Sequence, residues 1–346
     1  MDVTSAQVKA RAAGLGFDLC GVARARPLPP DRLDRWLSRK WDAGLAYVAE
    51  RRAERLDPSR LLPGARSVIV VAASYAPAPG DPEPAPGELA VARYARGRDY
   101  HNALLKPVRK LARWLRERGA AVYAEVDTGA VLEKAWAQEA GLGWIGKNGC
   151  LINERLGSWL LLGALIADAE LDPDPPHPDR CGECALCIPA CPTNAIPEPR
   201  YVDSNRCIAY HTIEHREVIP EEIALAAGRR IFGCDACQEV CPWNRRAPPA
   251  TLVALRARTP SLSVHEALAL TPDGARRRFE GTPLMRAGRD GLVRTALAVG
   301  DAPEEEARRL ARDPAPGVRE QALRRLQREG KVSTAPLTAP ASGDKR

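Results

Sequence analysis

Apolar residues in the first half of the chain form short uninterrupted runs that alternate with helical spacing. Three runs have the length of buried strands, and they are Ser67–Ser74, Ala120–Val126 and Ser158–Ala167. Between the first two, apolar residues recur every three or four positions and predict one buried helix face, made by Leu104, Val108, Leu111 and Leu115. This helix is expected to stop at Gly119. Strands that alternate with helices indicate an α/β region before residue 170.

Asp127 is the most suggestive acid of this region. It stands at the end of the Ala120–Val126 run and precedes a helix expected near Val131. Open α/β sheets place ligands at the carboxyl ends of their strands, which favours a catalytic carboxyl. The alternative is structural, because an Asp-Thr pair before a helix is also typical of an N-cap.

Eight of the ten cysteines form two interlocked runs in the middle of the chain. The first has the spacing Cys-x2-Cys-x2-Cys-x3-Cys-Pro, and the second ends in Cys-x2-Cys-x3-Cys-Pro after one distant cysteine. With this spacing, three thiolates bind one 4Fe-4S cluster and the fourth, before proline, binds the other. The spacing predicts two clusters with crossed ligands, Cys181, Cys184, Cys187 and Cys241 for one and Cys191, Cys207, Cys234 and Cys237 for the other. Such a protein transfers electrons singly.

Zinc and disulfides are the competing interpretations of these cysteines. A zinc site needs four ligands per metal and has no use for the third Cys-x2 step or the Cys-Pro ending. Disulfides need an oxidising compartment, and Met1–Ala10 lacks the basic and apolar regions of an export signal. The longest apolar stretch, Trp159–Ala167, is too short to cross a bilayer, so we expect a cytoplasmic protein. Cys20 and Cys150 lie outside both runs and are expected to be small core residues.

The chain after residue 245 is basic and has a helical pattern. Nine arginines accompany three acids over residues 245–289, and three of the arginines are contiguous at Arg276–Arg278. Two Ala/Leu/Arg helices follow, near Gly291–Val299 and Val318–Arg328, and short paired helices of this kind resemble HEAT-type repeats. A basic face on such helices predicts contact with a phosphate backbone. The alternative is that the arginines only solubilise an alanine-rich domain.

Several motifs together resemble the epoxyqueuosine reductase family. They are RYARGRDYH from Arg93, VDTG from Val126, GLGWIGKN from Gly141, IFGCDAC from Ile231 and the CPWN that ends the second cysteine run. The likeness extends to about residue 330, and the combination is more specific than the cysteine runs alone. It implies an α/β cobalamin-binding domain, a ferredoxin-like domain with two 4Fe-4S clusters and a carboxy-terminal α-helical HEAT-like domain. We place these at residues 1–170, 171–245 and 246–332, and expect a disordered tail at 333–346.

The resemblance implies the last step of queuosine synthesis, in which epoxyqueuosine at the wobble position of tRNA is reduced to queuosine. The clusters would relay electrons to cobalamin, bound base-off without a histidine ligand. Asp127 corresponds to the family's proton donor, and burial beside the corrin would raise its pKa enough to keep the proton near neutral pH. His101 and Lys134 match positions near the substrate pocket.

The remaining expected contacts rest on the same resemblance. Corrin contacts are expected at Arg55, Ala92, Asp127, Leu151, Leu162 and Ala209, and the last stands where relatives usually carry serine. On the basic face, tRNA contacts are expected at Arg286, Arg289 and Arg294. The expected partners are tRNA bearing epoxyqueuosine and an external one-electron donor such as flavodoxin or ferredoxin, and the chain is expected to be a monomer.

Two other functions share parts of this pattern. Reductive dehalogenases combine cobalamin with two clusters, but they usually carry a twin-arginine export signal, which the amino terminus lacks. An iron–sulfur electron-transfer protein without corrin would explain the cysteines alone. A corrin absorbance band in the pure protein would exclude this plain carrier.

Overall fold

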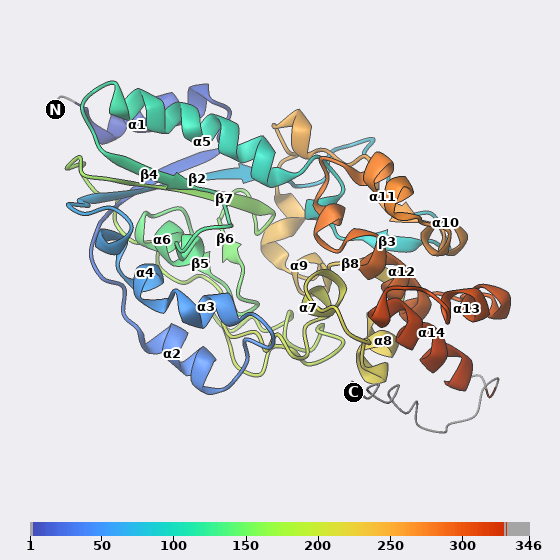
Figure 1. The fold of residues 1–346 in the computed structure, drawn as a ribbon. Coiled ribbons are helices and arrows are strands. Elements are labelled where there is room, and N and C mark those ends of the chain that lie inside the picture. Colours follow the sequence, from blue (N-terminus) through green and yellow to red (C-terminus); the bar gives the residue numbers. More distant parts are fainter. Residues whose placement is uncertain (1–2, 329, 331–346) are drawn as a thin grey trace, which may run out of the picture.

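The computed structural model describes residues 3–328 and 330, and the first half of the chain folds into three layers around one sheet (Figure 1). The sheet has the order β1-β2-β7-β4 and is antiparallel at every pairing. Its strands are β1 (Leu19–Arg24), β2 (Ser67–Ser74), β4 (Val122–Glu125) and β7 (Leu160–Ala167). Helices α1 (Ser5–Gly14) and α5 (Tyr100–Arg116) cover one face, and α6 (Glu133–Glu139) covers the other.

Strand β2 is buried along its whole length because both faces of the sheet are covered. Ile69, Val71 and Ala73 pack into the core under α1 and α5, whereas their neighbours Val68, Val70 and Ala72 pack into the core that contains α6. The three predicted strands and the predicted helix are confirmed.

The sheet differs from the parallel arrangement behind the argument for Asp127. Each strand runs opposite to its neighbour, so the carboxyl ends of neighbouring strands point in opposite directions along the strand axis. The rule that ligands gather at strand carboxyl ends belongs to parallel sheets and does not apply here. The position of Asp127 must be judged from its contacts.

Short elements extend the first region toward the cysteine-rich segment. Helices α2 (Asp31–Ser38), α3 (Ala46–Glu50) and α4 (Arg52–Leu56) follow β1, and a hairpin of β5 (Trp144–Ile145) and β6 (Leu151–Ile152) follows α6. The indole N–H of Trp36 donates a hydrogen bond to the carbonyl of Val202, 2.7 Å away, which ties α2 to the cysteine-rich chain. That chain is mostly irregular and includes α7 (Ile208–Ile213), α8 (Glu221–Ala227) and α9 (Ala236–Glu239).

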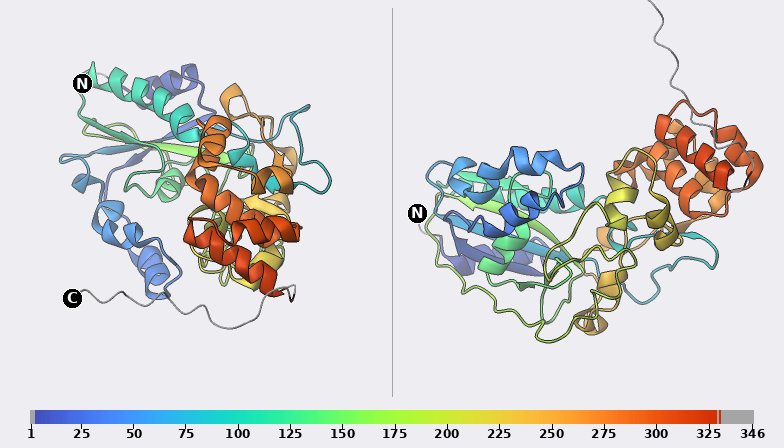
Figure 2. Two further views of the ribbon diagram at one scale, coloured as in Figure 1. Left: turned by 45° about the vertical axis from the view of Figure 1, so that its right-hand side comes forward. Right: turned by 90° about the horizontal axis from the view of Figure 1, so that it is seen from below.

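The carboxy-terminal region is a group of packed helices. They are α10 (Val264–Leu268), α11 (Pro272–Phe279), α12 (Gly288–Val299), α13 (Glu304–Leu310) and α14 (Pro316–Arg328). The two helices predicted here correspond to α12 and α14, and α13 lies between them in the sequence. Figure 2 shows this region at the opposite end of the molecule from the four-stranded sheet.

A small second sheet joins the first region to the carboxy-terminal helices. Strands β8 (Arg230–Phe232), β3 (Leu89–Val91) and β9 (Ser261–Leu262) pair in that order. Leu89, Val91 and Ala95 belong to the same core as the carboxy-terminal helices. A segment of the first region thus crosses to the helical one, and the four-region division stays a prediction.

Within the described residues, no helix is long and apolar enough to cross a membrane. The predicted tail, residues 333–346, lies outside the residues that the structure describes.

Candidate active site

Asp127 lies directly after β4 in a left-handed backbone conformation, with φ of 61°. Its Oδ2 accepts a hydrogen bond from the Tyr100 hydroxyl at 2.7 Å and lies 3.0 Å from His101 Nε2. Its main-chain N–H donates to Glu133 Oε1 at 3.0 Å. The N-cap of α6 is Leu132, so the N-cap interpretation of Asp127 is wrong. A left-handed aspartate held by three side chains is typical of a functional site.

His101 lies between two carboxylates. Its Nδ1 is 2.7 Å from Asp99 Oδ1, and its Nε2 faces Asp127. The hydrogen bonds to Asp127 and then to Asp99 raise the pKa of His101 to about 9, although burial opposes this. His101 is therefore protonated at neutral pH.

The pKa of Asp127 is lowered, whereas a raised pKa was expected. Burial raises it, but the hydrogen bonds from His101 and Tyr100 outweigh burial and hold the pKa of Asp127 below its ordinary value. The prediction of a raised pKa is wrong, because the sequence did not show the charged partner. At neutral pH the shared proton of this pair resides on His101.

The raised pKa that was expected of Asp127 is found at Glu133 instead. Burial, followed by the negative charges of Asp127 and Glu125, raises the pKa of Glu133 to about 8. Its carboxyl is mostly protonated at pH 7 and accepts the Asp127 N–H. Sequence reasoning missed this residue, since a glutamate in the first turn of a helix is also typical of a helix start.

Asp127 and Glu133 line a cavity of about 190 Å³. Four predicted residues meet there, namely Asp127, Lys134, Leu151 and Leu162. The cavity also takes in residues that sequence reasoning did not assign to a site, including Tyr75, Tyr94, Tyr100, Glu133, Cys150, Ser158, Leu160, Leu161 and Gln238. Leu160, Leu161 and Leu162, the first three residues of β7, are only partly buried and form part of the cavity wall.

Three predicted corrin contacts do not line this cavity. Arg55 is buried in α4, and its Nε has no hydrogen-bond partner among the described residues. The Arg55 guanidinium lies 5.8 Å from the ring centroid of Tyr47. Ala92 lines a different cavity, and Ala209 lies in α7.

The charges of the cysteines act on one another within the two predicted sets, but among the described residues no group of three or more His, Cys, Asp or Glu side chains could hold a metal ion, so the two ligand sets stay a prediction. Cys187 lies close enough to Cys181, Cys184 and Cys241 for their charges to act on its pKa, and we name these four the distal set. Cys237 is influenced in the same way by Cys234 and Cys207, and Cys207 by Cys191, and we name these four the proximal set. Asn148 links the proximal set to the cavity, because its side chain accepts the main-chain N–H of Cys150, which lines the cavity, and donates to the carbonyl of Cys237.

The two sets differ in exposure and in their hydrogen-bond donors. Cys184 of the distal set is exposed, and Trp144 Nε1 donates to Cys181 Sγ at 3.4 Å. In the proximal set, the main-chain N–H of Ala195 donates to Cys191 Sγ at 3.2 Å. N–H donors directed at sulfur are a usual feature of iron–sulfur sites.

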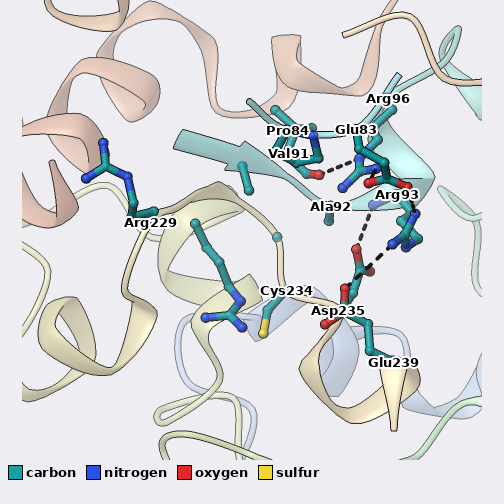
Figure 3. Close-up of a pocket in the computed structure, with 13 residues that line it drawn as sticks. Glu83, Pro84, Val91, Ala92, Arg93, Arg96, Arg229, Cys234, Asp235 and Glu239 are labelled. Atoms are coloured by element: carbon teal, nitrogen blue, oxygen red, sulfur yellow. Dashed lines mark hydrogen bonds and ion pairs between the residues drawn. The ribbon is translucent and has the colours of Figure 1, made fainter. Parts of the chain in front are cut away.

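A second cavity, of about 350 Å³, opens beside Cys234 (Figure 3). Figure 3 shows Glu83 between Arg93 and Arg96, with N···O distances of 2.8 and 2.9 Å. Asp235 Oδ2 accepts the Arg93 main-chain N–H at 2.7 Å, and burial raises the pKa of Asp235 to about 6. These paired charges hold the chain after β3 against the loop that carries Cys234.

The basic carboxy-terminal region presents only some of its arginines to solvent. Arg276, Arg277 and Arg278 are exposed on α11, and Arg278 pairs with Glu266. The side chain of Arg286 is 58% exposed and pairs with Glu214 at 2.7 Å.

Two of the predicted tRNA contacts turn inward instead. Arg289 is paired with Asp313, with its Nη1 at 2.8 Å. Arg294 is 1% exposed and donates to the carbonyls of His211 at 2.6 Å, Glu217 at 3.0 Å and His215. The prediction that Arg294 contacts tRNA is wrong, because a helix in the middle of a bundle buries its arginines as well as its leucines.

Known proteins resemble this chain in sequence and in structure. Residues 55–128 match the family model Epoxyqueuosine reductase QueG, and residues 180–244 match a 4Fe-4S double cluster binding domain. Epoxyqueuosine reductase of Gloeobacter violaceus is 49% identical over 253 residues, which are 71% of this chain and 78% of that protein. This chain belongs to the epoxyqueuosine reductase family. It is accordingly an oxidoreductase with an iron–sulfur domain.

Solved structures of the family share the fold. An epoxyqueuosine reductase with an epoxyqueuosine-modified stem loop of tyrosine tRNA is 26% identical, with a TM-score of 0.85, over 92% of this chain and 88% of that one. The enzyme from Bacillus subtilis, with its catalytic aspartate loop swung out of the active site, is 25% identical, with a TM-score of 0.80, over 93% and 89%.

Proposed function

We propose that this chain reduces epoxyqueuosine to queuosine in tRNA at the cavity beside Asp127. The conversion takes up two electrons and two protons and releases the epoxide oxygen as water. The observation that carries the proposal is that Asp127 and Glu133 line one cavity with Cys150, and that Asn148 links Cys150 to Cys237 of the proximal set. The solved relative with bound epoxyqueuosine stem loop supports the same substrate.

The two protons have two sources at or beside the cavity. His101, which does not line the cavity, is protonated at neutral pH and contacts Asp127 Oδ2, so its proton would pass through Asp127 to the epoxide oxygen. Glu133, whose Oε1 accepts the Asp127 main-chain N–H at 3.0 Å, carries a second proton on its other carboxyl oxygen. Tyr100 holds Asp127 Oδ2 in place throughout.

Base-off cobalamin would be held at this cavity. Leu151, Leu162 and the other leucines at the start of β7 offer an incompletely covered apolar wall, and Arg55, which lies outside the cavity lining, offers a buried Nε donor without a partner among the described residues. Cobalamin, when bound, supplies the metal centre that passes electrons to the epoxide-bearing carbon. Leu151 and Leu162 would exclude water from that surface, and Arg55 would bind a polar side group of the corrin.

The two sets of cysteines would each hold one 4Fe-4S cluster, with the ligands crossed between the runs. An external donor such as flavodoxin or ferredoxin would deliver electrons at the distal set, where Cys184 reaches the surface. The proximal set would pass them singly to the cavity.

The exposed arginines of α11 would bind the tRNA backbone, together with Arg286 at the edge of the helical region. In place of Arg294, which is buried, the contiguous Arg276–Arg278 become the principal candidates.

The test is a turnover assay on reconstituted protein. Anaerobic reconstitution should load about eight iron and eight sulfide per chain, as two 4Fe-4S clusters require. With cobalamin and a one-electron reductant, the protein should convert epoxyqueuosine in a tRNA stem loop to queuosine. A fully loaded protein that leaves the epoxide intact, or a protein that takes up zinc in place of iron, would overturn the proposal.

A further inference from the structure

Glu125 is a buried acid that lies two residues before Asp127 and takes no part in the proposed proton transfer. It is the last residue of β4 and is 6% exposed. Val126, the next residue, packs into the core under α1 and α5. Successive side chains of an extended chain point to opposite faces, so Glu125 faces the α6 side of the sheet. A carboxyl group buried there is costly unless hydrogen-bond donors reach it.

Two donors reach the carboxyl group of Glu125. Its Oε1 accepts the main-chain N–H of Val131 at 2.8 Å, and its Oε2 accepts the hydroxyl of Tyr123. Tyr123 lies on the same strand and belongs with the residues packed around α6. The bond to Val131 is buried, so removal of Glu125 would take away the acceptor of an N–H that water does not replace.

The bond from Val131 to Glu125 closes the loop of residues 126–131, which carries Asp127. The ends of the loop, Val126 and Val131, are buried, whereas Asp127 near its crest lines the cavity. Asp127 has a left-handed backbone, with φ of 61°. Such a conformation is strained at a residue other than glycine and persists only where the surrounding structure imposes it. The closed loop supplies one such constraint.

Gly129 shows how closely the loop wraps around the Glu125 carboxyl group. A Cβ atom at Gly129 would overlap Cδ and both carboxyl oxygens of Glu125. The φ of Gly129 lies outside the left-handed region, so glycine is required here by the lack of space and not by the backbone conformation. The loop and the carboxyl group therefore fit together as one unit.

We propose that Glu125 is a positioning residue, whose carboxyl group closes the loop of residues 126–131 and thereby holds Asp127 in reach of the epoxide. This rests on the proposed function, in which Asp127 passes a proton to the epoxide oxygen. The side-chain partners of Asp127 fix its carboxyl group but do not bind the far end of the loop at Val131. Without Glu125 that end is released, and Asp127 can move relative to the substrate.

The test compares three changes in reconstituted protein, alone and in combination. Glu125→Ala removes the acceptor, whereas Glu125→Gln keeps an oxygen for the Val131 N–H and an amide that can donate to Tyr123. Gly129→Ala adds the Cβ atom that overlaps the carboxyl group. The control is Glu117→Ala, which changes an exposed glutamate after α5. The measurements are kcat and KM for an epoxyqueuosine stem loop, iron content, cobalamin binding, and amide hydrogen exchange of residues 126–131.

We expect Glu125→Ala to lower kcat by about 10²-fold, as a displacement of about 1 Å from the reacting geometry does, with KM, iron content and cobalamin binding unchanged. The loop amides should exchange faster. Glu125→Gln should remain close to the parent in both respects. Turnover is compared at about pH 6, where Glu133 stays protonated even without the negative charge of Glu125.

The combination of changes gives a second, independent expectation. Gly129→Ala alone should lower kcat, but it should add little to Glu125→Ala, because the group that its Cβ atom overlaps is then absent. Full additivity of the two changes would show that Gly129 and Glu125 act separately, which would overturn the inference.

Other outcomes overturn the inference as well. They are a parent-like kcat or parent-like loop exchange in Glu125→Ala, and a loss of iron or cobalamin binding in that variant, since Glu125 would then only support the fold. A Glu125→Gln variant as slow as Glu125→Ala would show that the charge matters and not the acceptor. If the parent protein does not reduce epoxyqueuosine, the proposed function fails, whereas loop exchange still decides whether Glu125 holds the loop. The two failures are therefore distinguishable.

Discussion

The distal and proximal sets of cysteines have the same ligand type and opposite surroundings. The distal set reaches solvent through Cys184, beside Leu186, which is 48% exposed. The proximal set is joined through Asn148 to Cys150, which lines the cavity of Asp127. Under the proposed function, this difference predicts that electrons enter at the distal set and are used beside the proximal set.

The sharpest test of this division removes one ligand from each set. Cys191→Ser should lose the proximal cluster, keep about four iron and lose turnover with any reductant. Cys184→Ser should lose the distal cluster, and turnover should disappear with a protein donor but persist in part with a small chemical reductant that can reach the proximal cluster. Iron analysis and turnover with both reductants check the prediction. The division is refuted if the two variants respond alike.

A second test addresses the chemistry on the proximal side alone. Asp127→Asn keeps the size of the side chain but cannot carry a proton, so turnover should fall by about 10²-fold or more. Cluster spectra and cobalamin binding should survive, as in the control Asp31→Asn, which changes an exposed aspartate of α2. Parent-like turnover of Asp127→Asn would leave Glu133 as the donor to examine.

The pH dependence of turnover separates the two proton sources. The protonated form of a group predominates below its pKa, so loss of the His101 proton should lower turnover as the pH rises through about 9. Glu133 should contribute an earlier decline near pH 8. His101→Gln should abolish the decline near 9, and Glu133→Gln the one near 8. Profiles of both variants that match the parent would show that neither group supplies a proton.

The smallest expected effect concerns the surface far from both sets. Replacing Arg276, Arg277 and Arg278 by glutamine should weaken tRNA binding and reduce the salt dependence of the affinity, by about 0.7 to 0.9 in the logarithmic slope for each phosphate that the protein no longer neutralises. Turnover at saturating tRNA should be unchanged. Arg286→Gln tests the remaining exposed position. Unaltered affinity in both variants would locate the tRNA site elsewhere.

The sequence predicted the elements whose pattern is local. The buried runs became β2, β4 and β7, the helical spacing became α5, and the cysteine spacing predicted the 4Fe-4S double cluster domain that residues 180–244 match. Properties that depend on distant partners were missed. The pKa of Asp127 follows from His101, which is 26 residues away.

The arginines show the same limit of prediction from a sequence pattern. A count of positive charge cannot distinguish Arg276, which faces solvent, from Arg294, which the bundle encloses. Only the packing of α12 against α7, α10, α11 and α14 decides which guanidinium groups are free to meet a polyanion.

The enclosed Arg294 also limits how this protein could be re-engineered. Its guanidinium supplies donors to three carbonyls in or just after α7, the helix whose N-cap is Cys207. A chimera that exchanged the carboxy-terminal helices for those of another protein would leave these carbonyls buried without the Arg294 donor, close to Cys207. The carboxy-terminal helices and α7 must therefore be exchanged together, because the hydrogen bonds of Arg294 join the helical region to the cysteine-rich region.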